Sequence, residues 1–139
     1  MKRTRYTIQP DARDALVRCL TAELEKDSAV AFAYLHGSLL HSETVHDIDV
    51  GLYVRESEAE RGSAIASELS ARLTSVAGIP VDVRVLNEAP LPFLYHVFRG
   101  QLLVCRDEDL LTAMLEDVAR RYLDLAPMLR QGTKDAFAA

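Results

Sequence analysis

The sequence predicts an α/β (α+β) protein in which helices cover a sheet. Short apolar segments rich in β-branched and aromatic residues alternate with longer segments whose apolar residues recur every three or four positions. The chain of 139 residues is of ordinary size for one domain, and it contains no linker, internal repeat or low-complexity segment. We therefore expect a single domain over residues 1–139.

The elements follow from this periodicity and from the residues that bound them. Pro10 and Asp11 suit a helix start, because proline fits a first turn and an acidic side chain there interacts favourably with the helix dipole. Gly78 is a natural helix stop. The expected elements, in order, are a helix at 11–27, strands at 30–36 and 47–54, a helix at 56–77, a strand at 79–86, an apolar turn or short helix at 92–100, a strand at 101–105 and a final helix from 106 that bends or ends at Pro127.

The polar loop at 37–46 and its borders hold the first candidate site. Gly37 and Ser38 end one strand, and Asp47 and Asp49 open the next. Alternate residues of a strand share a face, so the two carboxylates would lie about 6–7 Å apart along it. Oxygen ligands suit magnesium, and a Gly-Ser step can bring backbone amides close to a phosphate. The alternative is ordinary turn chemistry at a solvated rim.

Asp82 is a third candidate. It alternates with valines in the period-two strand 79–86, so it faces the opposite way from them. If this strand lies beside 47–54, a third carboxylate joins the first two. If it is simply an edge strand, Asp82 is a solvent-facing residue paired with Arg84.

With these positions in view, the chain resembles the minimal nucleotidyltransferases, the small stand-alone members of the polymerase-beta-like nucleotidyltransferase superfamily. The resemblance rests on HGS at 36–38, DIDVGLYV at 47–54, PVDVRVLNEAP at 80–90, RGQLLVCRDED at 99–109 and YLDLAP at 122–127. It implies the nucleotidyltransferase fold, with a mixed four-stranded sheet. It also implies that Gly37 and Ser38 contact the nucleotide phosphates and that Asp47 and Asp49 hold Mg²⁺. Asp82 would complete the metal site and help to activate the attacking hydroxyl.

The resemblance further implies a magnesium-dependent enzyme that moves AMP, or another NMP, from ATP or another NTP to a hydroxyl. Stand-alone domains of this kind are typically antitoxins whose partner is a HEPN-type ribonuclease toxin, inactivated by adenylylation. One departure is that the loop between Ser38 and Asp47 has eight residues and no Arg or Lys, whereas commoner forms have a longer loop with an Arg soon after the Ser. Two alternatives stay open: a non-catalytic antitoxin that neutralises its partner by binding, and an enzyme acting on a small molecule.

Composition excludes some other classes. A net charge of −5 argues against a direct nucleic-acid binder that relies on a basic surface. No apolar run approaches the length of a membrane span, and no signal peptide is recognisable. Cys19 and Cys105 fit no metal-ligand spacing and are expected as reduced core thiols, so we expect a cytoplasmic protein. The irregular spacing of His36, His41 and His46 does not favour zinc.

Overall fold

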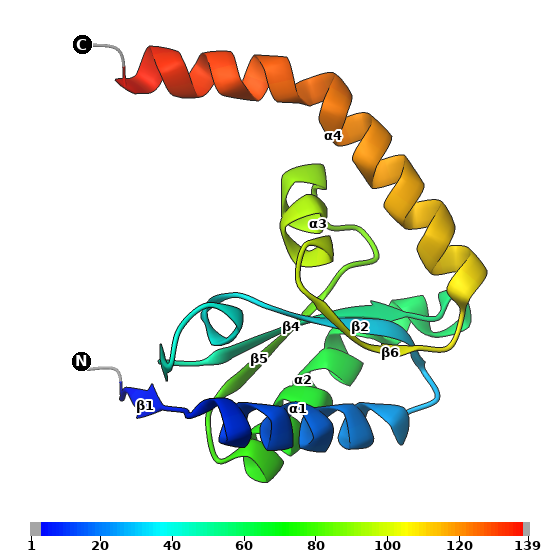
Figure 1. The fold of residues 1–139 in the computed structure, drawn as a ribbon. Helices are drawn as coiled ribbons and strands as arrows, with labels where there is room; N and C mark the ends of the chain where they lie inside the picture. Colours follow the sequence, from blue (N-terminus) through cyan, green and yellow to red (C-terminus); the bar gives the residue numbers. More distant parts are fainter. Residues whose placement is uncertain (1–3, 138–139) are drawn as a thin grey trace.

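The computed structural model describes residues 4–137, with side chains described to residue 124 (Figure 1). Most expected elements form, with ends shifted by one or two residues. The elements, in order, are β1 (Tyr6–Thr7), α1 (Pro10–Glu25), β2 (Val30–His36), the 3-10 turn η1 (Ser38–Leu40), β3 (Thr44–Val45), β4 (Ile48–Val54), the 3-10 helix η2 (Glu56–Arg61), α2 (Gly62–Ala77), β5 (Val81–Val85), α3 (Leu91–Phe98), β6 (Gln101–Cys105) and α4 (Glu108–Phe137).

The main sheet is mixed and four-stranded, as the resemblance implies, in the order β5-β4-β2-β6. β4 runs parallel to β5, whereas β2 is antiparallel to both β4 and β6. A second, two-stranded sheet pairs β1 with β3. The sequence did not reveal this small sheet, because strands of two residues are too short to show a period.

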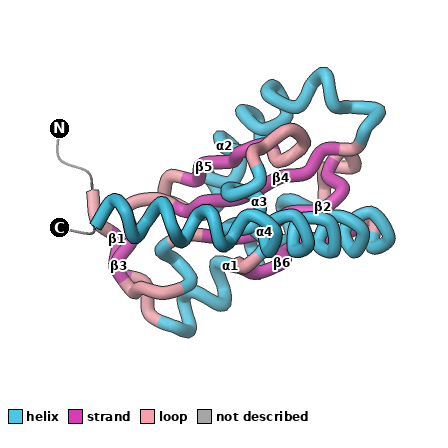
Figure 2. The backbone as a smooth tube through the Cα atoms, turned by 90° about the horizontal axis from the view of Figure 1, so that it is seen from above, coloured by secondary structure: helices cyan, strands magenta, loops and turns pink. Residues whose placement is uncertain are grey.

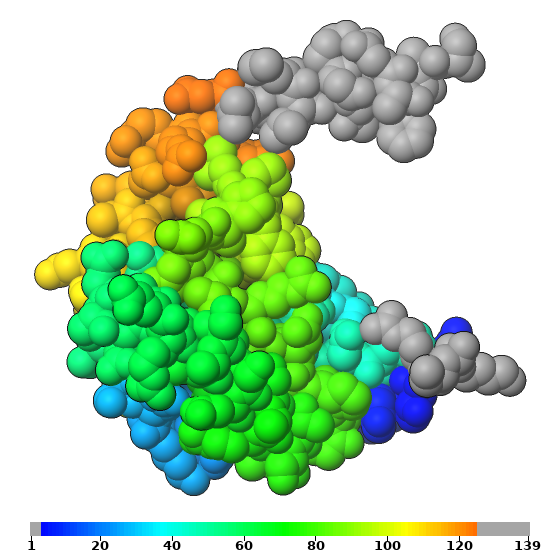
Figure 3. Space-filling model, turned by 180° about the vertical axis from the view of Figure 1, so that it is seen from behind, coloured from blue at the N-terminus to red at the C-terminus, as the bar shows by residue number. Residues whose placement is uncertain are grey.

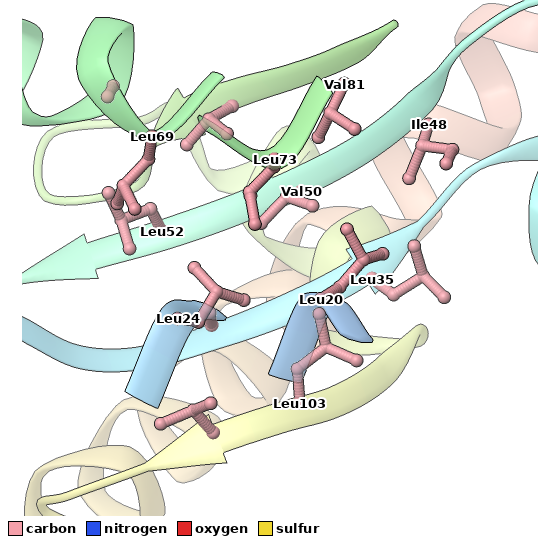
Figure 4. Packing of buried hydrophobic residues seen from close by; sticks show 14 of the residues in the cluster. Leu20, Leu24, Leu35, Ile48, Val50, Leu52, Leu69, Leu73, Val81 and Leu103 are labelled. Atoms are coloured by element: carbon pink, nitrogen blue, oxygen red, sulfur yellow. The ribbon is translucent and has the colours of Figure 1, made fainter. Parts of the chain in front are cut away.

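Helices cover both faces of the main sheet (Figures 1 and 2). α1 and α2 pack on one face, where leucines from both helices meet apolar side chains of all four strands, as Figure 4 shows. α3 and the first part of α4 pack on the other face, against Phe32, Tyr34 and their neighbours. The segment at 91–98 therefore packs as the helix α3 on the sheet. β2 lies between the two layers, and all seven of its residues are buried.

Two expected helices differ from the structure. The helix expected at 56–77 is a 3-10 helix up to Arg61, and α2 begins only at Gly62. Glycine weakens helix propagation, so a change of helix type there is physically reasonable. The final helix continues past Pro127 to Phe137, with a visible bend in its second half (Figure 1). An interior proline removes one backbone hydrogen bond and kinks a helix without necessarily ending it.

The two cysteines differ in their exposure to solvent. Cys19 is exposed on α1 and Cys105 is half-buried, so the expectation of core thiols is wrong for Cys19. The apolar stripe of α1 buries Leu20 and Leu24 but leaves Cys19 beside it in solvent.

Among the helices within residues 4–137, none combines the length and hydropathy needed to cross a membrane.

Candidate active site

Three polar residues stand in register across neighbouring strands. Asp49 of β4 is the Cα partner of Asp82 in β5 and of His36 in β2. Directly paired residues share a face of a sheet. Ile48 and Val50, on either side of Asp49, point into the core beneath α1 and α2, so this row lies on the face that carries α3. The expectation that the strand holding Asp82 would lie beside 47–54 is confirmed.

The carboxylate of Asp49 is half-buried, and its surroundings disfavour its charged form. Burial raises its pKa, and the charges of Asp47 and Asp82 raise it further, while Arg84 and His96 act in the opposite direction. A group whose charged form is disfavoured by burial and by like charges gains most from a bound cation. Asp47 directly precedes β4 and is also half-buried.

Gly37 fits the turn beside Asp49 closely. Its backbone has φ +86° and ψ −156°, a region that is essentially restricted to glycine. A Cβ atom at this position would lie 2.4 Å from Asp49 Oδ2, far inside van der Waals contact. The backbone of the Gly-Ser step therefore lies against the carboxylate of Asp49. Ser38 follows at the exposed start of η1, where its carbonyl accepts hydrogen bonds from His41 N at 3.0 Å and Ser42 N at 2.9 Å.

Asp82 is engaged with a neighbour. Arg84 Nε donates to Asp82 Oδ2 at 3.1 Å, and both side chains are largely exposed on the edge strand β5. The guanidinium also lies 5.9 Å from the centroid of the Phe93 ring. Both interpretations of Asp82 therefore describe it correctly: it lies in register with Asp49, and it is an edge-strand residue paired with Arg84.

α3 adds residues that the sequence motifs did not identify. The rings of Phe93 and His96 lie edge-on to the His36 ring, with centroids 5.7 and 5.5 Å away. Their contribution could not be read from the sequence, because they occupy an apolar segment whose position over the sheet depends on tertiary packing. In the surface view of Figure 3, the segment between β2 and β4 (cyan) and α3 (yellow-green) border the same hollow.

His36 is held neutral at physiological pH. It is only 6% exposed, and its Nε2 atom is buried without a hydrogen-bond partner. Burial, followed by the nearby His96 and Arg84, lowers its pKa from 6.5 to about 4, although Asp82 has the opposite influence. His41 is exposed and His46 contacts Thr4 O through Nδ1 at 3.0 Å, so the three histidines do not gather as a zinc site would require.

The substitution His36→Phe should flatten the acid dependence of stability. Between pH 6.5 and 4, His36 is protonated in the unfolded chain but neutral in the folded protein. The free energy of unfolding therefore decreases as the pH falls through this window. Since one pKa unit is worth about 1.4 kcal/mol and solvent screens part of the effect, we expect a loss on the order of 2 kcal/mol in the parent protein. Urea unfolding at pH 7 and pH 4.5 measures it. An equal acid-induced loss in the variant would contradict this explanation.

A cavity of about 810 Å³ adjoins the row of polar residues. Arg84, the ion-pair partner of Asp82, and Phe93 belong to its wall. Its other walls come from the end of β4, from η2, from the start of α2 and from the turn after β5. Tyr53, Ser63 and Asn87 are among its lining residues, together with Glu56, Glu60 and Glu88.

The donor set fits magnesium in one specific way. Within residues 4–124, no group of three or more His, Cys, Asp or Glu side chains is arranged to hold a metal ion. Mg²⁺, however, is usually bound by one or two protein carboxylates together with substrate phosphates and water. Asp47 and Asp49, whose charges act on one another, could supply such a pair of oxygen donors, and the Gly37 backbone lies against Asp49. Asp82 engages Arg84 through its Oδ2 atom.

Solved structures with the same fold come from toxin–antitoxin complexes. A chain of the tri-AMPylated Shewanella oneidensis HEPN toxin in complex with MNT antitoxin is 19% identical, with a TM-score of 0.60 over 91% of this chain and 99% of that one. A chain of a toxin–antitoxin complex with AMP-PNP is 19% identical, with a TM-score of 0.61 over 88% and 98%. The toxin–antitoxin MntA-HepT gives 19% identity and a TM-score of 0.58 over 91% and 99%. At such identities these likenesses establish the fold alone.

Sequence comparison establishes the family. No curated protein sequence matches the chain significantly. The family model described as "Polymerase beta, Nucleotidyltransferase" matches residues 19–109, which is more than half of the chain and includes the Gly-Ser step, both carboxylates of the Asp-x-Asp pair and Asp82. The chain therefore belongs to the polymerase beta nucleotidyltransferase family.

Proposed function

We propose that this protein is a magnesium-dependent nucleotidyltransferase that moves AMP, or another NMP, from a nucleoside triphosphate to a hydroxyl of a partner protein. The protein would then be a cytoplasmic antitoxin, and its partner would be a HEPN-type ribonuclease toxin. The observation that carries the proposal is the placement of Asp82 in register with Asp49, with the Gly37 backbone against the same carboxylate. Family membership supports it, as does the shared fold with chains of an AMPylated HEPN toxin–MNT antitoxin complex and of a toxin–antitoxin complex with AMP-PNP.

The chemistry is a transfer at the α-phosphorus. The acceptor oxygen forms a bond to the α-phosphorus, the bond from that phosphorus to the bridging oxygen breaks, and pyrophosphate leaves. Asp82, on the neighbouring strand, would take the proton of the acceptor hydroxyl. Asp47 and Asp49 would hold the magnesium ion, which neutralises charge on the phosphates when it is bound. The backbone at Gly37 and the Ser38 hydroxyl would orient the phosphates.

A non-catalytic binding module is the second candidate, and specific observations favour it. Asp82 is occupied by Arg84, and the loop between Ser38 and Asp47 has no Arg or Lys. Against it stands the pKa of Asp49, which burial and the charges of Asp47 and Asp82 raise. A protein that only binds its partner gains nothing from a half-buried carboxylate whose charge two neighbouring carboxylates disfavour.

The experiment is a label-transfer assay. The purified protein is mixed with the product of the neighbouring gene, Mg²⁺ and α-labelled ATP, with GTP, CTP and UTP in parallel. We expect label on the partner from one of these nucleotides, dependent on Mg²⁺. Label from the γ-position should stay off the partner, because pyrophosphate leaves. A stable complex that acquires no label from any nucleotide would reject the enzyme and favour the binding module.

A further inference from the structure

Arg84 is the one arginine or lysine that the described structure pairs with the Asp82–Asp49–His36 row, and the other basic side chain beside the row is His96. Arg84 pairs with Asp82 at 3.1 Å, and it acts on the pKa values of both Asp49 and His36, so its charge is felt across the row. The loop that could have offered a cation beside the Gly-Ser step contains no Arg or Lys. Arg84 therefore supplies a permanent positive charge beside the row, to which a nucleotide with several negative charges is attracted.

The geometry leaves Arg84 able to bind a second anion. Its pairing with Asp82 uses the Nε–H, and no other hydrogen bond of its guanidinium is found among the described residues. The side chain is 64% exposed, and its guanidinium carbon lies 5.9 Å from the centroid of the Phe93 ring. Guanidinium groups present several N–H donors in a fixed fork that matches phosphate oxygens.

We propose that Arg84 binds the phosphates of the incoming nucleoside triphosphate and that, before the nucleotide binds, Arg84 is paired with Asp82. Asp82 then exchanges its partner: it releases the guanidinium to the phosphates and becomes available to the acceptor hydroxyl and the metal. The exposed Arg84–Asp82 pair is weak, so the exchange has a small cost. This inference rests on the proposed function and assigns Arg84 the role that an arginine in the loop would otherwise have.

The first test measures equilibrium binding of AMP-PNP by calorimetry, with Mg²⁺ and without a partner protein. We expect Arg84→Ala to weaken binding by about 10- to 100-fold, because charge-assisted hydrogen bonds to phosphate are lost, and Arg84→Lys to recover part of it. The matched control is Arg99→Ala. Arg99 is also an exposed arginine of the α3 region, lying 5.8 Å over the Tyr95 ring, but it has no contact with the polar row.

The second test addresses the competition between Asp82 and the phosphates for Arg84. In metal-free buffer, Asp82→Asn should bind AMP-PNP about threefold more tightly than the parent, because Arg84 is released. In the Arg84→Ala background the same Asp82 substitution should give no gain, which separates release of Arg84 from a general loss of negative charge. A gain of equal size in both backgrounds would overturn the partner exchange.

The outcomes separate the two proposals. Binding of AMP-PNP by the parent that Arg84→Ala leaves unchanged overturns the assignment of Arg84 and leaves the nucleotidyltransferase proposal standing. Absence of AMP-PNP binding by the parent, with Mg²⁺ present, overturns both. Binding lost in Arg84→Ala but kept in Arg99→Ala supports the assignment, provided that both variants melt at the temperature of the parent.

Discussion

Replacing Asp49 by Asn should reduce nucleotide transfer by at least about 100-fold while leaving the protein as stable as before or more so. The loss follows because the substitution removes a charge at the centre of the site, where fixed charge stabilises the transition state. The gain in stability follows because burial and two neighbouring carboxylates disfavour the charge of Asp49. A folded state that raises the pKa of a carboxyl group favours its neutral form. The neutral amide of Asn therefore removes an unfavourable charge from the folded protein at pH 7. Transfer rates and thermal melting, measured on the same preparation, check both halves.

The control for this prediction is Asp14→Asn. Asp14 is exposed on α1, which covers the opposite face of the sheet, so its amide should change neither transfer nor melting by a measurable amount. An Asp49→Asn variant that transfers nucleotide within tenfold of the parent would remove Asp49 from the catalytic site. A variant that loses transfer because it melts far below the parent would show a structural effect in place of a chemical one.

Replacing Gly37 by Ala should also reduce transfer by about 100-fold, for a geometric reason. The added Cβ would lie 2.4 Å from Asp49 Oδ2, so the carboxylate or the turn must move. A displacement of about 1 Å in a catalytic group is enough to cause such a loss. The substitution should further destabilise the fold by about 1–3 kcal/mol, because φ +86° with ψ −156° is a region that alanine strongly avoids. Initial transfer rates at saturating ATP and denaturant unfolding measure the two effects.

Gly78→Ala separates the conformational cost from the contact with Asp49. Gly78 also has positive φ, at +72°, where it ends α2, but an added Cβ would meet no atom within 4 Å. We expect a loss of about 1 kcal/mol in stability and unchanged transfer. If both glycine variants lost transfer in proportion to their loss of stability, the special role of Gly37 would be wrong.

The sequence predicted the elements best where a period is long enough to be visible. β2 and β4 stand out because apolar and aromatic residues fill them, and the alternation in β5 placed Asp82 opposite its valines. The pairing of Asp82 with Asp49 needed one further fact, the neighbourhood of β4 and β5, which no local pattern contains. The two-residue strands β1 and β3 left no periodic signal at all.

The rest of the site depends on tertiary packing. Phe93 and His96 join it because α3 folds back over the sheet, and nothing in their own segment distinguishes them from core residues. The contact between Gly37 and Asp49 joins a turn to a strand across the loop at 37–46, so the Gly-Ser motif could suggest a phosphate but not this packing. The ion pair of Arg84 with Asp82, in contrast, follows from their spacing of two on one strand, and the sequence suggested it.

The proposed metal and nucleotide site is tested by a crystal structure of the protein with Mn²⁺ and AMP-PNP, using anomalous scattering to locate the metal. We predict an anomalous peak within about 2.2 Å of carboxylate oxygens of Asp47 and Asp49, bridged to phosphate oxygens that lie against the Gly37 backbone. Metal and nucleotide bound elsewhere on the protein, with the carboxylates of Asp47 and Asp49 contacting neither, would show that the proposed site is wrong.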